Sequence, residues 1–138
     1  MAGEDYNHGT GHGVGYLLNV HEGPNRFRWK TAPGQSACVL EEGMITSNEP
    51  GYYVENEFGI RHENLIVCKK AEKTAYGQFM CFENLTMVPF DLDGIVPELL
   101  SDHEKELLNQ YHAEVYTKIS PYLNEEEKQW LKEVTREI

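Results

Sequence analysis

The sequence predicts an α+β fold in which a β-rich part, residues 1–90, precedes a helical part, residues 91–138. The first part alternates short apolar runs with turns that contain glycine and proline, a pattern typical of strands joined by tight connections. In the second part, apolar residues recur at helical spacing behind a capping motif. We therefore expect two regions of different architecture, with a boundary near residue 90.

The expected strands are the apolar runs that lie between turn residues. An apolar segment behind the glycine-rich start predicts a strand over 14–20, and the prolines within 24–37 predict a loop. Residues 43–47 predict a strand that Pro50 and Gly51 end. The remaining predicted strands are 52–54 and 58–68, which form a hairpin around 55–57, and a strand within 77–88.

Two helices are expected at the end of the chain. Ser101 and Glu104 have capping-box spacing, in which a hydroxyl and a carboxylate satisfy the free amides of a helix start. Pro121 ends the first helix, and Asn124 can cap the second. The apolar faces are given by residues 107, 108, 111, 115 and 119 in the first helix and by residues 130, 131, 134 and 138 in the second.

Charge and hydropathy exclude two classes of partner. Acidic residues outnumber basic ones by 23 to 12, which gives a formal net charge of −11. A negative protein without a lysine or arginine cluster repels phosphate backbones, so nucleic-acid binding is not expected. No apolar run approaches the roughly 18 residues that a bilayer-spanning helix needs, and the start of the chain does not resemble a signal peptide. We expect no membrane association.

The three cysteines, Cys38, Cys68 and Cys81, are odd in number and widely spaced, with no CxxC pair, so neither a disulfide framework nor a structural zinc site is expected. Reduced thiols are typical of a cytoplasmic protein, which is the location we expect. Cys68 lies in an apolar run and is expected to be a small buried side chain.

The strongest chemical signal is a glycine-rich run that carries histidines. His8 and His12 belong to His8-Gly-Thr-Gly-His12-Gly-Val-Gly, and His21 follows within Asn19-Val-His21-Glu-Gly-Pro. The glycines argue against a helix, so the spacing of four between His8 and His12 does not indicate a helical zinc motif. A single histidine is more often structural than a metal ligand, but glycine lets a backbone approach an ion or a substrate closely.

Two carboxylates in separate segments complete the pattern. Glu49 precedes Pro50 at the end of a predicted strand, where it is either a solvated turn residue or a group that points into a cleft. Glu63 lies in a strand-like segment, and a central strand would bury it and require a partner or an ion. Arg61, two residues earlier, shares a strand face with Glu63 and can either pair with it or bind substrate.

Taken together, these motifs resemble the pita-bread metallopeptidases, and most of all their cytosolic-type Xaa-Pro aminopeptidases (aminopeptidase P). The resemblance rests on the two histidine motifs, on Asn48-Glu-Pro-Gly-Tyr-Tyr53 and on Gly59-Ile-Arg-His-Glu63-Asn, and it covers nearly the whole chain. It implies the C-terminal half of a pita-bread fold, a curved and mostly antiparallel sheet, followed by a helical hairpin that forms a C-terminal extension.

The resemblance also assigns roles to positions. His12, Glu49 and Glu63 match metal ligands, and Glu63 matches the residue that bridges two ions and moves a proton. His21 matches a catalytic histidine that contacts the substrate. Substrate-binding positions around the proline ring are matched by His8, Tyr53 and Arg61. The implied enzyme is a hydrolase that removes an N-terminal residue preceding proline from a peptide.

Manganese is the cofactor that the resemblance implies, as two ions in a complete site, with cobalt or zinc as alternatives. Carboxylate oxygens with one imidazole suit manganese, and a divalent ion can supply a nucleophile at neutral pH and polarise a carbonyl. An activated nucleophile is needed because the Xaa-Pro bond is a tertiary amide without an N–H, which general peptidases cleave poorly.

The family also uses two aspartate ligands upstream of the histidine run, and only seven residues precede His8 here. We therefore expect this chain to hold at most one ion, weakly, and to be inactive alone. A half-sheet has an unpaired edge and an uncovered apolar face, which predicts a homodimer or association with a missing N-terminal half. The alternative functions are a non-catalytic pita-bread module that binds peptides or proteins, and another peptidase of the same fold.

Overall fold

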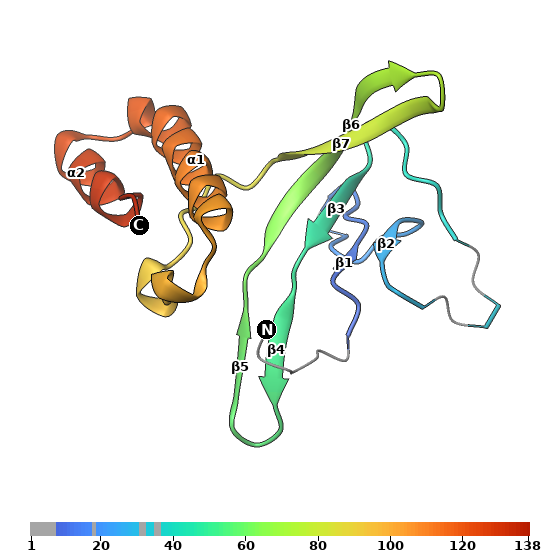
Figure 1. Ribbon diagram of the computed structural model, residues 1–138, viewed down its shortest axis with the longest axis horizontal. Helices are drawn as coiled ribbons and strands as arrows, with labels where there is room; N and C mark the ends of the chain where they lie inside the picture. The colour runs from blue at the N-terminus through green and yellow to red at the C-terminus, as the bar shows by residue number, and fades with distance from the viewer. Residues whose placement is uncertain (1–7, 18, 31–32, 35–36) are drawn as a thin grey trace. The chain divides into compact units, whose positions relative to one another are not determined.

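A computed structural model describes residues 8–17, 19–30, 33–34 and 37–138 of the chain. The chain divides into two compact units, residues 1–86 and 87–138. Every strand lies in the first unit and both α-helices lie in the second, among the residues described (Figure 1). The predicted α+β class is confirmed.

The first unit consists of antiparallel strand pairs. A three-stranded sheet has the order β3-β6-β7, and two further pairs are β1 with β2 and β4 with β5. The strands are β1 (Gly11–His12), β2 (Arg26–Phe27), β3 (Ile45–Asn48), β4 (Gly51–Val54), β5 (Phe58–Arg61), β6 (Asn64–Thr74) and β7 (Gly77–Asn84).

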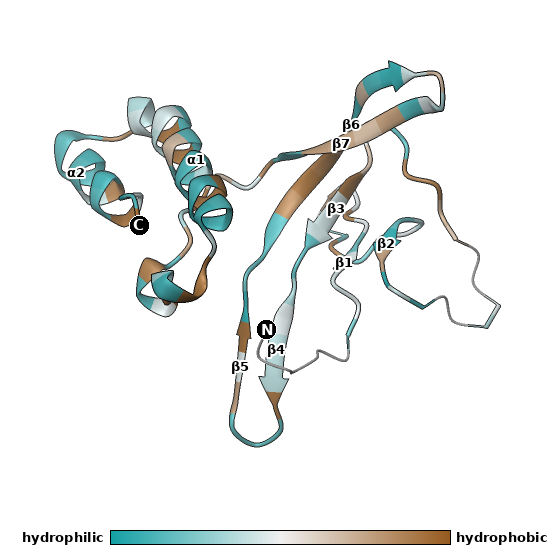
Figure 2. Cartoon of the chain, in the orientation of Figure 1, coloured by the Kyte–Doolittle hydropathy of each residue, from teal (hydrophilic) through white to brown (hydrophobic). Residues whose placement is uncertain are grey.

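The central strand β6 is apolar where it pairs with β3. Ile66, Val67 and Cys68 are buried there, and Cys68 has no exposed surface. Figure 2 shows hydrophobic colours along this stretch and hydrophilic colours toward the far end of the β6–β7 hairpin. The apolar run therefore places β6 in the core, and the prediction of Cys68 as a buried side chain is confirmed.

The strand predicted over 14–20 is wrong, because the described residues of this segment form a loop. Strand β1 instead lies within the glycine-rich run itself. The loop is closed by backbone hydrogen bonds from Gly13 N to Asn25 O (2.8 Å) and from Glu22 N to Gly13 O (2.9 Å). Two of its apolar side chains face solvent, with Tyr16 85% exposed and Leu17 80% exposed.

Two other expectations need correction. The loop predicted over 24–37 contains the short strand β2, which pairs with β1. The strand predicted over 58–68 is interrupted at 62–63, so that β5 and β6 belong to different sheets. The hairpin of β4 and β5 around residues 55–57 and the strands at β3 and β7 are confirmed.

The second unit contains α1 (Asp102–Ile119) and α2 (Glu125–Val134), with short 3₁₀ turns η1 (Leu92–Gly94), η2 (Pro97–Leu99) and η3 (Ser120–Tyr122). Ser101 and Glu104 form the predicted capping box of α1. Asn124 caps α2 and forms a second capping box with Glu127. Both helix starts are therefore determined by local side chains.

The core of the second unit joins the two helices. Tyr111 and Val115 of α1 pack with Leu131 of α2, and all three are buried. The Tyr111 hydroxyl donates to the carbonyl of Val88 (2.8 Å), which ties the segment before η1 to α1. Among the described residues, no helix has both the length and the apolar character needed to cross a membrane.

His112 has no exposed surface, and its Nε2 accepts a hydrogen bond from the Phe90 amide (3.0 Å). Burial lowers the pKa of His112 below its usual value of 6.5. The unfolded chain therefore binds more protons than the folded one as pH falls below about 6.5. We expect the unfolding free energy of this unit to be fully retained above that pH and to decrease below it.

Urea unfolding followed by circular dichroism at 222 nm between pH 7.5 and 5.5 measures this effect. In H112Q, the pH dependence should be weaker than in the wild type, because the titrating imidazole is absent. Equal pH dependence in the two proteins would show that His112 does not cause it.

Candidate metal centre

The centre lies where β1 runs beside β3 in the first unit. The Glu49 amide donates to the Thr10 carbonyl (2.7 Å), and the His12 amide donates to the Ser47 hydroxyl (3.0 Å). Gly13 forms a β-bridge with Thr46. These contacts bring His12 and Glu49, which are far apart in the sequence, to the same place.

The glycines of the run allow this close packing. A Cβ on Gly11 would lie 2.1 Å from the Ser47 carbonyl oxygen, and a Cβ on Gly13 would lie 2.1 Å from the Glu22 carbonyl oxygen. Backbone therefore occupies the space that a side chain would need. The described geometry explains these two glycines by contact between segments of the chain, whereas the sequence suggested approach to an ion or substrate.

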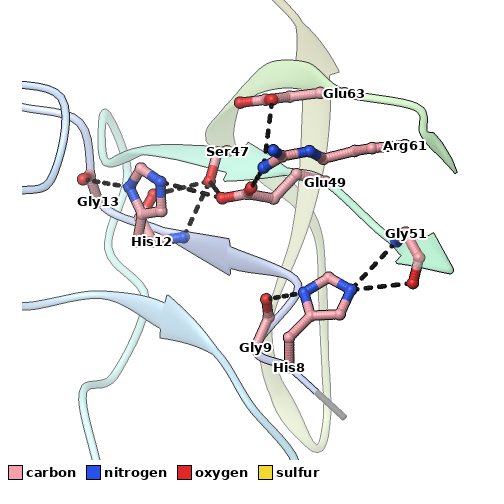
Figure 3. A network of polar contacts seen from close by, with 9 residues as sticks. All are labelled: His8, Gly9, His12, Gly13, Ser47, Glu49, Gly51, Arg61 and Glu63. Carbon is pink, nitrogen blue, oxygen red and sulfur yellow. Dashed lines mark hydrogen bonds and ion pairs between the residues drawn. The ribbon is translucent and has the colours of Figure 1, made fainter. Parts of the chain in front are cut away.

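His12 and Glu49 form the central contact of the site. His12 Nε2 lies 2.9 Å from Glu49 Oε1, while His12 Nδ1 lies 3.0 Å from the Gly13 carbonyl oxygen (Figure 3). In the metal-free contact, a proton on Nε2 faces the carboxylate and a proton on Nδ1 faces the carbonyl; an ion that replaces the Nε2 proton would meet the tautomer of a metal ligand, with Nδ1–H still held by Gly13. The Ser47 hydroxyl donates to Glu49 Oε1 (2.8 Å) and orients the carboxylate.

Arg61 connects the two predicted carboxylate ligands. Its Nη1 donates to Glu49 Oε2 and lies 3.9 Å from Glu63 Oε2. Figure 3 shows the guanidinium between the two glutamates. The sequence offered pairing with Glu63 or substrate binding, and the shorter contact is with Glu49.

Glu63 does not lie in a central strand, which was the condition for its burial. Its side chain is 45% exposed, because residue 63 lies between β5 and β6 and not within a central strand. The Glu49 side chain, by contrast, is only 9% exposed. The buried carboxylate of the site is therefore Glu49, which the sequence alone did not distinguish from a solvated turn residue.

The ionisation of Glu49 reflects its partners. Burial alone would raise the pKa of this carboxyl group, but hydrogen bonds from Ser47 and Arg61 and the charges of His12 and Arg61 lower it. The net result is a pKa below the usual 4.5. Glu49 is therefore an anion at neutral pH, as a metal ligand must be.

The other two predicted histidines, His8 and His21, have separate neighbours. The rings of His21 and His12 have centroids 4.4 Å apart. His8 Nε2 lies 3.0 Å from Gly51 O and 3.2 Å from Gly51 N, and the His8 ring meets Tyr53 edge to face at 5.4 Å. The described structure thus brings His8 together with Tyr53, and His21 together with His12.

The donor set fits a divalent ion in part. Among the residues the structure describes, no group of three or more histidine, cysteine, aspartate or glutamate side chains is arranged to hold a metal. The contacting pair of imidazole and carboxylate, each oriented by a second hydrogen bond, has the chemistry of a ligand pair. Glu63 is separated from Glu49 by the Arg61 guanidinium.

Two supporting residues were not predicted from the sequence. Ser47 shares a strand face with Glu49, a spacing of two that could have indicated its contact. Asn25 is buried and donates from Nδ2 to the Ile45 carbonyl (3.0 Å) and to the Thr46 hydroxyl. No local signal marks Asn25, because its partners lie in a distant segment.

Two family models match the chain. Residues 2–70 match metallopeptidase family M24, and residues 78–138 match the C-terminal region of peptidase M24. The first match contains the whole of the site described above. The second contains both helices.

Named relatives and a solved structure agree with these matches. The chain is 43% identical to "Probable Xaa-Pro aminopeptidase P" of Coprinopsis cinerea and 46% identical to "Aminopeptidase P2" of Arabidopsis thaliana, over 99% of its length. It spans 22% and 19% of those proteins. The crystal structure of X-prolyl aminopeptidase from Caenorhabditis elegans, described as cytosolic with a di-nuclear active site, matches with a TM-score of 0.80 at 36% identity, covering 99% of this chain and 22% of that one.

Proposed function

We propose that this chain, which belongs to metallopeptidase family M24, supplies His12, Glu49 and Glu63 as ligands of the metal centre of an Xaa-Pro aminopeptidase. The observation that carries the proposal is the 2.9 Å contact between His12 Nε2 and Glu49 Oε1, with each group oriented by a further hydrogen bond. The chain corresponds to the C-terminal portion of such an enzyme.

The chemistry of the site follows from its donors. A bound divalent ion supplies a Lewis acid for the scissile carbonyl and a nucleophile at neutral pH. Glu63, half-exposed at the edge of the site, is suited to carrying a proton between water and the leaving nitrogen. To His21, whose ring lies beside His12, we assign a hydrogen bond to the substrate carbonyl.

Recognition of proline is assigned to His8, which lies ahead of β1, to Tyr53 in β4 and to Arg61 at the end of β5. His8 and Tyr53 meet edge to face, and an aromatic surface of this kind suits an apolar ring. Arg61 lies opposite Gly51 in the β4–β5 register and can contact the peptide from there. Together these side chains would favour a peptide with proline in its second position.

Further aspects of the proposal rest on the relatives. Manganese is the proposed ion, with cobalt or zinc as alternatives, and a di-nuclear site is described for the structural relative. A cytoplasmic location agrees with the cytosolic relative and with the free thiols of Cys38, Cys68 and Cys81.

A partner for the sheet is also proposed. β7 is the outer strand of the order β3-β6-β7, and within the described part of the chain nothing pairs with its outer edge. Phe79 and Phe82 on this strand are 51% and 41% exposed. An apolar outer strand of eight residues favours pairing, either with a second copy or with an N-terminal half of the fold.

Calorimetric titration with Mn²⁺ tests the proposed function. We expect the wild-type chain and H103A, which lacks an exposed histidine of α1, to bind the ion, and H12A to bind it far more weakly. The chain alone should give negligible turnover of a peptide with proline second, because it spans only about a fifth of the length of its relatives.

Other results would change the conclusion. Turnover comparable to that of a full-length relative would contradict the proposed inactivity of the isolated chain. Tight binding of a proline peptide without any binding of Mn²⁺ would favour the non-catalytic binding module.

A further inference from the structure

Arg61 occupies a position with an unusual charge environment. A single guanidinium nitrogen, Nη1, faces carboxylate oxygens from two separate segments, Glu49 Oε2 and Glu63 Oε2. The remaining oxygen of Glu49, Oε1, is already engaged by His12 and Ser47. Arg61 is therefore the group that balances the charge between the two glutamates.

A metal ion shared by the same two glutamates needs the same space. Hard divalent ions bind carboxylate oxygens at roughly 2.0–2.6 Å. Nη1 cannot remain in hydrogen-bond contact with Glu49 Oε2 while such an ion lies between that oxygen and Glu63 Oε2. Repulsion between the ion and the guanidinium also favours movement of the Arg61 side chain away from the glutamates.

The Arg61 guanidinium can move away from Glu49 and Glu63 without disturbing the core. Its side chain is 45% exposed, and its backbone is held in the β4–β5 hairpin opposite Gly51. A rotation of the side chain toward solvent breaks only the contacts of the guanidinium. Glu49, in contrast, is held in place by the Ser47 hydroxyl.

We propose that Arg61 is the resident counter-ion of the metal-free centre, which holds Glu49 and Glu63 in place until a divalent ion displaces its guanidinium. This inference rests on the proposed function. It adds that the Arg61 guanidinium and the metal ion compete for the carboxylate oxygens of Glu49 and Glu63. The measured affinity for the ion then includes the loss of the contacts of Arg61.

Titration of Mn²⁺ into Arg61 variants without substrate tests the competition. We expect R61Q to bind the ion about fivefold more tightly than the wild type, because a charge-assisted hydrogen bond no longer has to be broken. R61K keeps the charge and should stay within about twofold of the wild type. The matched control is K70Q, which removes a cation paired with Glu42 in the same unit and should not change affinity.

Thermal unfolding gives a second readout. Without metal, R61Q should melt at a lower temperature than the wild type, because two neighbouring carboxylates lose their counter-ion. The increase in melting temperature on adding saturating Mn²⁺ should be larger in R61Q than in the wild type.

A third measurement needs no substitution. In the wild-type chain, the Arg61 Nη–Hη signals in an NMR titration with diamagnetic Zn²⁺ should move to the positions of a solvated arginine as the site fills, because Nη1 makes the contacts with both glutamates. An Arg61 signal that stays unchanged at saturation would overturn the inference, as would equal or weaker affinity in R61Q. If no variant and no wild-type protein binds a divalent ion, the proposed function fails as well.

Discussion

Replacing Glu49 by glutamine should weaken the binding of Mn²⁺ on the order of a hundredfold or more, since even substitution of groups that only orient ligands costs 10- to 100-fold. The amide keeps the shape of the side chain but loses the negative charge. Glu49 is the buried partner of His12, Ser47 and Arg61, so no other described carboxylate can take its place in this network. Calorimetric titration of the wild type and E49Q measures the difference.

The matched control is E42Q. Glu42 is also a carboxylate of the first unit with a cationic partner, but it is about half exposed and pairs with Lys70, not with the site. E42Q should therefore bind Mn²⁺ as the wild type does. Equal binding by E49Q and E42Q would remove Glu49 from the metal centre.

A second large effect is expected in the helical unit. Truncation of Leu131 to alanine should lower the unfolding free energy of this unit by about 3 kcal/mol. The loss of buried apolar surface and the cavity left behind both contribute to this cost. Leu131 is 2% exposed and packs with Tyr111 and Val115. Urea unfolding followed at 222 nm reports this unit, because both α-helices belong to it.

L107A provides the comparison for this measurement. Leu107 lies on α1 and is 51% exposed, so the same chemical change should cost no more than about 0.5 kcal/mol. Similar losses in L131A and L107A would mean that the core formed by Tyr111, Val115 and Leu131 does not stabilise the unit.

The helices and hairpins could be predicted because their signals are local. Ser101 with Glu104, and Asn124 ahead of α2, satisfy amides within one turn, so a few neighbouring residues are enough to define each helix start. The turn around 55–57 likewise joins strands that are adjacent in sequence. These parts of the fold depend little on distant segments.

The errors arose where distant segments decide the structure. Apolar composition at 14–20 suggested a strand, but hydrogen bonds between Gly13 and residues 22 and 25 hold this segment in a loop. Sequence motifs identified the histidines and glutamates of the site together. They did not show that Glu49 is buried while Glu63 is exposed, because β3 and the end of β5 approach each other only in the folded chain.

The central claim is that His12 and Glu49 jointly bind a divalent ion, and anomalous diffraction from crystals grown with Mn²⁺ tests it most directly. The account predicts an anomalous peak in contact with His12 Nε2 and a carboxylate oxygen of Glu49, with the Arg61 guanidinium turned away. An anomalous peak at other side chains, with the His12–Glu49 and Arg61–Glu49 contacts still intact, would contradict it.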